Sequence, residues 1–294
     1  MRIVAGCDGG GTKCHVRVCV VDDSQAIVRT GEFISGPSNV RSNPDAALQN
    51  IQAATCEALL AAGIPRDGRI ETFVAALAGS GDLDRQREWQ IRLADVLPVA
   101  QVLVVPDPAI LFAAADVEDG SSAVATIVGT GAIAWARNQI GEITRAGGLG
   151  PKIGDEGSGY WIGREALRRS SDWTGAVGDS AFRERIALVT DESDVAQVAS
   201  LSADVFRLAA SDSQMRSIVD DAAEEIATLV ADAVQAIETS PDCPLRWVCA
   251  GGVAVNQARW LRAVQDRCIG KGVFLQSPDV ISRPVEGAIK MALK

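Results

Sequence analysis

Near its start the chain reads Val4-Ala5-Gly6-Cys7-Asp8-Gly9-Gly10-Gly11-Thr12-Lys13-Cys14-His15-Val16. Apolar and β-branched residues flank an acid and three successive glycines, a pattern that predicts two strands joined by a tight turn. Residues without a Cβ let the backbone fold closely, and amides freed in such a turn can surround a phosphate. The alternative is a glycine-rich hairpin that binds no ligand. The turn is not a Walker A loop, because no helix is predicted directly after Lys13.

Strands and helices alternate outward from this hairpin. Strands are predicted over 2–7, 12–21, 26–34, 72–78 and 101–105, and helices over 44–62 and 84–97. Asn43-Pro44-Asp45 opens the first helix with a capping side chain and with proline at the first helical position. This alternation predicts an α/β fold.

The same arrangement returns in the second half of the chain. Strands are predicted over 123–128 and 132–137, joined by Gly129-Thr130-Gly131. This echo, about 120 residues after the first hairpin, predicts two related halves. The turn also fits the weak G-x-G-x-x-A form of a dinucleotide fingerprint, but a Rossmann turn opens a helix and this one leads into a strand.

The rest of the chain is predicted to be mostly helical, with a buried strand over 246–249 and a last helix over 284–293. We therefore expect two α/β domains, one formed by residues 1–117 with 281–294 and the other by residues 118–280. Each should hold a mixed sheet flanked by helices.

Asp107 follows a buried strand and stands between two prolines. The prolines deny it a place in a regular hydrogen-bonded ladder, so its carboxylate is predicted at a strand terminus, where α/β folds bind their ligands. A helix N-cap is an equally good interpretation of Asp107-Pro108, and one carboxylate can serve both roles.

The stretch from residue 146 to residue 159 is too glycine-rich for a packed element and contains the adjacent acids Asp155 and Glu156. It predicts a binding loop, and a mobile surface loop is the alternative. The only histidine, His15, lies on the second predicted strand and is expected to be structural. A single histidine excludes Ser-His-Asp triads and His-rich metal sites.

Composition narrows the class of protein. A hydrophobic content of 47% suits a globular chain, and a formal charge of −10 disfavours nucleic acid and anionic membranes as partners. No apolar run is long enough for a membrane helix. Seven scattered cysteines without a C-x-x-C pair suit free thiols, so a cytoplasmic location is expected.

Four blocks in a fixed order resemble the N-acetylglucosamine kinases and the related BadF/BadG/BcrA/BcrD-type ATPases of the actin, hexokinase and Hsp70 superfamily. The blocks are Asp8 to Lys13, then Pro106-Asp107, then Val128-Gly129-Thr130-Gly131 with Gly154-Asp155-Glu156-Gly157-Ser158, and last Ala250-Gly251-Gly252-Val253. The resemblance implies two ribonuclease H-like domains with a cleft between them, and a homodimer. It also implies a kinase that uses ATP and Mg²⁺ to phosphorylate the 6-hydroxyl of an amino sugar, N-acetylglucosamine first.

The resemblance also assigns residues to these roles. ATP would contact Gly9, Gly10, Gly11, Thr12, Lys13, Gly129, Thr130, Gly131, Gly251, Gly252 and Val253, and Asp8 would act on the metal. Asp107 would be the catalytic base, and the sugar would be held by Asn39, Asp107, Gly147, Gly148 and Asp155. One departure is that Val40 and Arg41 follow Asn39, where mammalian-type enzymes carry an aromatic residue close by.

Three other functions fit part of this pattern. One is a kinase of the same fold for glucosamine or another hexose. Another is an activator-type ATPase of a dehydratase or reductase, which holds an iron–sulfur cluster with cysteines, although no cysteine lies in or near residues 147–159. The third is a sugar sensor without catalysis, which would not need the predicted base and both phosphate turns.

Overall fold

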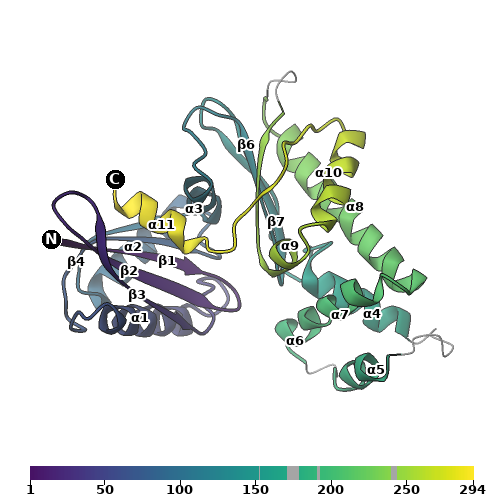
Figure 1. Ribbon diagram of the computed structural model, residues 1–294, viewed down its shortest axis with the longest axis horizontal. Helices are drawn as coiled ribbons and strands as arrows, with labels where there is room; N and C mark the ends of the chain where they lie inside the picture. The colour runs from purple at the N-terminus through teal and green to yellow at the C-terminus, as the bar shows by residue number, and fades with distance from the viewer. Residues whose placement is uncertain (152, 171–178, 191–192, 240–243) are drawn as a thin grey trace. The chain divides into compact units, whose positions relative to one another are not determined.

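The computed structural model describes residues 1–151, 153–170, 179–190, 193–239 and 244–294. The chain divides into two compact units, Met1–Asp116 with Arg283–Lys294, and Val117–Ser282. Each unit contains one five-stranded sheet with helices packed on it (Figure 1). Both sheets combine parallel and antiparallel pairs, which confirms the predicted α/β class with mixed sheets.

The sheet of the first unit has the strand order β3-β2-β1-β4-β5. Its strands are β1 (Arg2–Gly9), β2 (Cys14–Val21), β3 (Ile27–Ser35), β4 (Ile70–Leu77) and β5 (Val99–Val105), and its helices are α1 (Pro44–Ala61), α2 (Leu83–Val96), α3 (Asp107–Ala114) and α11 (Val285–Ala292). The hairpin of β1 and β2 is antiparallel, whereas β1, β4 and β5 run parallel. As predicted, Asn43 caps α1, because its side chain accepts a hydrogen bond from the amide of Ala46.

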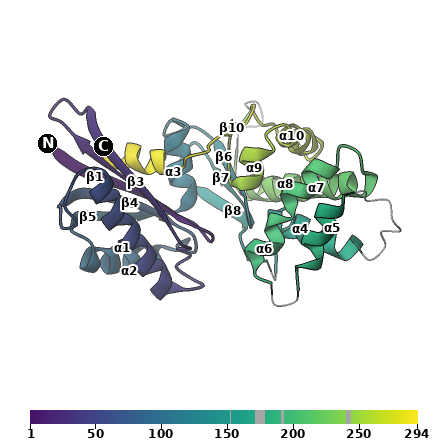
Figure 2. The same cartoon turned by 60° about the horizontal axis from the view of Figure 1, so that its bottom comes forward.

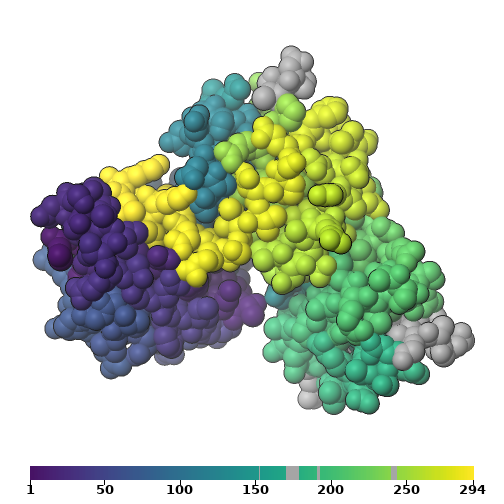
Figure 3. All heavy atoms as spheres, in the orientation of Figure 1, coloured from purple at the N-terminus to yellow at the C-terminus, as the bar shows by residue number. Residues whose placement is uncertain are grey.

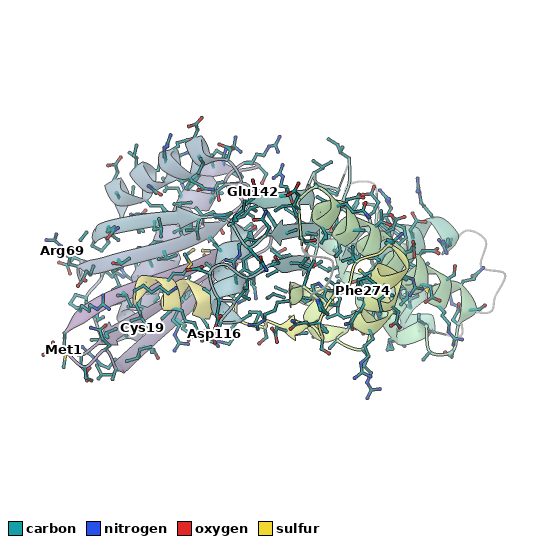
Figure 4. The ribbon with its side chains drawn as sticks, turned by 90° about the horizontal axis from the view of Figure 1, so that it is seen from above. Met1, Cys19, Arg69, Asp116, Glu142 and Phe274 are labelled. Carbon is teal, nitrogen blue, oxygen red and sulfur yellow. The ribbon has the colours of Figure 1, made fainter. Side chains whose placement is uncertain are left out.

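Helices cover both faces of this sheet. On one face, α1 and α2 pack on residues such as Val16 and Phe73. On the other, α3 and α11 pack on Val4 and Val74, and Figure 3 shows α11 in yellow against the purple N-terminal part of the unit. Figure 4 shows Asp116 beside α11, where its carboxylate accepts a hydrogen bond of 2.6 Å from Lys290. The C-terminal helix therefore completes the core of the N-terminal unit.

The sheet of the second unit has the order β10-β9-β6-β7-β8. Its strands are β6 (Ala123–Val128), β7 (Ala132–Arg137), β8 (Ile143–Gly147), β9 (Arg246–Ala250) and β10 (Asp279–Val280). Its helices are α4 (Gly159–Ser170), α5 (Ser180–Ala187), α6 (Val195–Ser200), α7 (Ser202–Leu208), α8 (Ser213–Gln235), α9 (Gly252–Asn256) and α10 (Trp260–Gly270).

The long helix α8 organises the core of this second unit. Met215, Ile218 and Ile226 recur at helical spacing on its buried face, which packs on β7 and β8. Figure 2 shows α7 and α10 beside α8. Under this helical layer, the indole nitrogen of Trp247 donates a hydrogen bond of 3.0 Å to the hydroxyl of Thr126. None of the described helices has both the length and the apolar character needed to cross a membrane.

Two elements of the second unit differ from the expectation. The predicted loop begins inside a strand, because Ala146 and Gly147 pair with Ala134 and Ile133 as the end of β8. The edge of the sheet accepts a glycine there, since one side of the ladder is open. The short helix α9, which begins at Gly252, was not among the predicted elements.

The contact of α11 with α3 leaves no room for a side chain at Gly287. A Cβ at this position would lie 1.8 Å from the carbonyl oxygen of Ile110. We expect Gly287→Ala to lower the free energy of unfolding by about 1–3 kcal/mol, although alanine favours an ordinary helix. At Gly270, in the last turn of α10, an added Cβ has no neighbour within 4 Å. Gly270→Ala is thus the matched control and should be neutral or slightly stabilising in urea denaturation. Equal urea midpoints for the two variants would contradict this account.

Candidate active site

The carboxyl ends of β1, β4 and β5 meet at one edge of the first sheet. Asp8 is in register with Ala76 on β4, and Ala76 is in register with Val105 on β5. Asp107 follows Val105 by two residues, as the first residue of α3. The parallel register therefore brings two carboxylates, far apart in sequence, to the same edge of the sheet.

The two carboxylates lie close enough to affect each other. Burial, and then the negative charge of Asp8, raise the pKa of Asp107 to about 7. Burial raises the pKa of Asp8 to about 6, and the nearby Lys13 ammonium opposes this rise. Both acids thus hold their protons more tightly than a carboxyl group in water.

Asp107 is not the N-cap of α3. Pro106 occupies the cap position, and no side-chain hydrogen bond caps this helix. The carboxylate of Asp107 therefore does not serve the capping role that its sequence allowed. Its place at the strand edge fits the other interpretation, a side chain positioned for a ligand.

The glycine turn between β1 and β2 is anchored to its neighbours through the backbone. The amide of Gly10 donates to the carbonyl of Lys13 at 2.8 Å, and the carbonyl of Gly10 accepts from the amide of Ser38 at 2.9 Å. The carbonyl of Gly9 accepts from the amide of Ala78 at 2.7 Å. Gly11, Thr12 and Lys13 are exposed, and a Cβ at Gly11 would meet nothing within 4 Å. The tip of the turn has the open space that a bound phosphate requires.

Asn39 lies in the loop that this turn anchors. Its Oδ1 atom accepts hydrogen bonds from the amides of Arg41, at 2.9 Å, and Ser42, at 3.1 Å. Gly79, in the turn after β4, has φ +91° and packs so closely on Asn39 that a Cβ would lie 2.8 Å from the same oxygen. Sequence reasoning did not single out Gly79, although a glycine shortly after a buried strand is a signal for a close backbone approach.

The departure at Val40 has a structural explanation. Val40 is only 4% exposed and belongs to the core on the α1 face of the sheet, while Arg41 is exposed. Val40 therefore packs inside the unit, whereas Arg41 faces solvent.

The second unit holds a corresponding group of glycines. Gly251 has φ +93°, and a Cβ there would lie 2.8 Å from the amide nitrogen of Gly129. The first amide of α4, from Gly159, donates to the carbonyl of Gly129 at 2.8 Å, and the amide of Tyr160 donates to Thr130 at 3.1 Å. The turn at 129–131 and the segment 251–253 are thus in contact, within a single unit.

Asp155 lies beside this turn. It is 7% exposed with φ +63°, and its carboxylate accepts hydrogen bonds from the amides of Ala132 and Gly150. A Cβ at Gly131 would lie 2.7 Å from its Oδ2 atom. Burial raises the pKa of Asp155, and these two amides oppose the rise. A cavity of about 110 Å³ adjoins it, lined also by Glu156.

Gly147 and Gly148 continue this group, with φ values of +71° and +66°. The amide of Gly148 donates to the carbonyl of Ala132 at 2.9 Å, which places both glycines next to the turn. Lys152, in the same loop, lies outside the described residues.

The predicted site residues therefore form two groups, one in each unit. The first contains Asp8, the turn at 9–13, Asn39 and Asp107, and the second contains 129–131, Gly147, Gly148, Asp155 and 251–253.

The chemistry of the first group fits a magnesium ion carried with a nucleotide. Mg²⁺ prefers oxygen ligands, keeps several waters and is often held by one or two carboxylates together with phosphates. Asp8 offers such a carboxylate next to the exposed turn, and burial raises its pKa, so a cation nearby would stabilise its charged form. No group of three or more potential ligands among His, Cys, Asp and Glu occurs in the described residues.

Solved structures share this fold. A candidate N-acetylglucosamine kinase from Porphyromonas gingivalis aligns with a TM-score of 0.71 at 21% identity, over 100% of this chain and 99% of its own. A ROK family glucokinase from Streptomyces griseus, in complex with glucose and AMPPNP, aligns with a TM-score of 0.60 at 17% identity, over 99% of this chain and 98% of its own. The two units therefore have the actin/hexokinase-like architecture that the resemblance implied.

Sequence comparison identifies the family. The model of the BadF/BadG/BcrA/BcrD ATPase family matches residues 5–292, so the chain belongs to this family. A curated relative, the N-acetylmuramic acid/N-acetylglucosamine kinase of Clostridium acetobutylicum, is 31% identical over 173 residues. That alignment covers 57% of this chain and 53% of the relative, or about half of the relative's length.

The raised pKa values make the stability of the fold depend on pH. The folded pKa values, about 6 for Asp8 and about 7 for Asp107, exceed the ordinary value of 3.8, so the folded state binds more protons than the unfolded state between these limits. The free energy of unfolding should fall as the pH rises from about 4 to about 7. Asp107→Asn, which cannot ionise, should unfold at a higher urea concentration than wild type at pH 8, with a smaller difference at pH 5.

Asp95→Asn provides the control, because Asp95 is exposed on α2. Its urea midpoint should differ from wild type by the same small amount at both pH values. If Asp107→Asn behaved like this control, Asp107 would not be held in an enclosed, charge-repelling position.

Proposed function

We propose that this protein is an ATP-dependent kinase that phosphorylates the 6-hydroxyl of an amino sugar, with N-acetylglucosamine as the first candidate. The observation that carries the proposal is the Asp8–Asp107 pair at the strand edge, beside an open glycine turn. Membership of an ATPase family supports the use of ATP. The name of the Clostridium acetobutylicum relative supports an N-acetylated amino sugar as the acceptor.

The glycine residues would bind the nucleotide. Backbone amides of the turns at 9–13 and 129–131 would donate to phosphate oxygens, and Lys13 would add a positive charge. The segment 251–253 would border the adenosine. Magnesium, when bound, would neutralise phosphate charge, and Asp8 would hold it through water.

Asp107 would act as the general base. Phosphoryl transfer depends mainly on alignment and on charge stabilisation, and the acceptor hydroxyl must lose its proton as its bond to phosphorus forms. A carboxylate with a pKa near 7 is matched to accepting that proton at neutral pH, a contribution of about 10²–10⁴ in rate. Because the proton leaves through Asp107, the glycine amides are left to stabilise the phosphoryl oxygens.

Asn39 and Asp155 would orient the sugar. Asn39 uses its Oδ1 atom within its own loop, so its Nδ2 group is the part that can donate to a sugar hydroxyl. Asp155 keeps its carboxylate in place through two backbone amides and can accept from a further hydroxyl. Gly147 and Gly148 would let the sugar approach the backbone. Homodimer formation and a cytoplasmic location stay predictions from the sequence.

We expect Asp107→Asn to reduce kcat at least about 10²-fold while sugar binding changes only a few-fold, because the amide keeps the shape but cannot accept the proton. The measurement is ADP release at saturating N-acetylglucosamine and Mg-ATP, with Asp95→Asn as the control. A kcat equal to that of wild type would mean that Asp107 is not the base.

A second test addresses the acceptor. Asp155→Asn and Asn39→Ala should raise the KM for the sugar by about tenfold and change the KM for ATP little, since a lost hydrogen bond to a charged or polar partner costs about 1–3 kcal/mol. ADP release should be compared over N-acetylglucosamine, N-acetylmuramate, glucosamine and glucose. A larger effect on the KM for ATP than on that for the sugar would place these residues at the nucleotide instead.

A further inference from the structure

Two cysteines face each other beneath the glycine turn of the first unit. The Sγ atoms of Cys7, on β1, and Cys14, on β2, lie 3.5 Å apart, and both side chains are 0% exposed. They bracket residues 8–13, which include Asp8 and the whole turn. Both are free thiols in the structure.

The register of the hairpin explains this approach. Cys14 lies directly opposite Gly9, and Cys7 lies opposite Val16, so the two thiols are diagonal neighbours on one face of the sheet. Gly9 has no side chain, and Cys14 can therefore reach across the strand toward Cys7. Diagonal neighbours on an antiparallel pair are usually within reach only of long side chains, but here the 3.5 Å between the Sγ atoms shows that the two short side chains meet. A disulfide requires the sulfur atoms to approach from 3.5 Å to about 2.05 Å, a movement that side-chain rotation and a small strand shift can supply.

We propose that Cys7 and Cys14 are an oxidisable dithiol, and that a hydroperoxide converts them to a disulfide which disables the glycine turn above them. The second part rests on the proposed role of that turn in nucleotide binding. The modification site itself rests only on the two thiols and their geometry.

The chemistry balances in two steps. One thiol attacks the peroxide oxygen, so the O–O bond breaks, a sulfenic acid forms and an alcohol or water leaves. The second thiol then attacks the sulfenic sulfur, the S–S bond forms and water leaves. In total the two thiols lose two electrons and two protons, and the hydroperoxide gains them. A small thiol reductant reverses the reaction by exchange.

The exposed turn gives the oxidant its route. Cys14 directly follows Gly11, Thr12 and Lys13, which are all exposed, so a peroxide that enters through the turn meets Cys14 before Cys7. A nucleotide bound on the turn would cover this route. The rate of oxidation should therefore fall when Mg-ATP is present.

The disulfide would act on the turn through its ends. Closing the S–S bond draws Cys7 on β1 toward Cys14 on β2. These two positions bracket Asp8 and the turn in the chain, so the ends of the turn move with them. The alignment of a bound phosphate is lost when the groups that hold it move by about 1 Å. The strand shift caused by the disulfide should therefore weaken nucleotide binding at least about tenfold.

The test uses the purified full chain. Trypsin cleaves after Arg2, Lys13 and Arg17, so it separates the two cysteines into peptides 3–13 and 14–17. After treatment with hydrogen peroxide, alkylation and non-reducing digestion, we expect these peptides to be joined, and to separate on reduction. Calorimetry with Mg-ATP should show the loss of nucleotide affinity and its recovery after dithiothreitol.

Two variants complete the experiment. Cys14→Ala should keep the nucleotide affinity of the reduced protein within about threefold and lose both the joined peptide and the response to peroxide. Cys268→Ala removes a buried thiol of the second unit and should respond like wild type. If peroxide consumed other thiols and left 3–13 and 14–17 unjoined, the dithiol assignment would be wrong. Joined peptides with unchanged nucleotide affinity would overturn the effect on the turn, whereas joined peptides in a chain that never binds ATP would overturn the proposed function and leave the dithiol in place.

Discussion

Two partly buried carboxylates, close enough for one charge to affect the other, set the main constraint on the first unit. Asp8 and Asp107 approach because β1, β4 and β5 run parallel and end at one edge. Burial raises the cost of ionising both groups, and the charge of Asp8 adds to the cost for Asp107, so stability alone does not favour this placement. A cation, or a proton accepted from a substrate, would offset the negative charge of these two carboxylates. Raised pKa values of this kind are common at functional sites, which agrees with the proposed role of the pair.

The same constraint explains the backbone around the pair. A negatively charged substrate can approach two carboxylates only if amide groups and a metal ion provide positive potential. The open glycine turn and Lys13 follow Asp8 directly, at the end of β1. The same hairpin therefore supplies both the carboxylate and the groups that oppose its charge.

Much of this could be predicted from the sequence, because local chemistry decided it. Short stretches of the chain are enough to predict the glycine turns between apolar strands, the cap at Asn43 and the helical repeat in α8. The end of β8 could not be predicted this way. Gly147 is in a strand because it pairs with Ile133 on β7. This tertiary pairing overrides the local preference of glycine for a loop. Whether Asp107 caps α3 needed the structure for the same reason, since capping and ligand binding share one local pattern.

The glycines show a further limit of sequence reasoning. Gly11 stands in open space, whereas Gly251 has a left-handed backbone and packs on Gly129, so the first leaves room for a ligand and the second is required by backbone packing. The sequence marks both as glycines in a motif and cannot separate approach to a ligand from approach to the backbone. Only the neighbours within a few ångströms make that distinction.

The return of α11 to the first unit has a consequence for how the protein is made. Val4, Cys19 and Val21 on the sheet are covered by α3 and by α11, which is synthesised long after the strands it covers. On the ribosome, the second unit can therefore complete its core before the first. Until α11 emerges, one apolar face of the N-terminal sheet lacks part of its cover, which makes the nascent chain a natural client for chaperones during that interval.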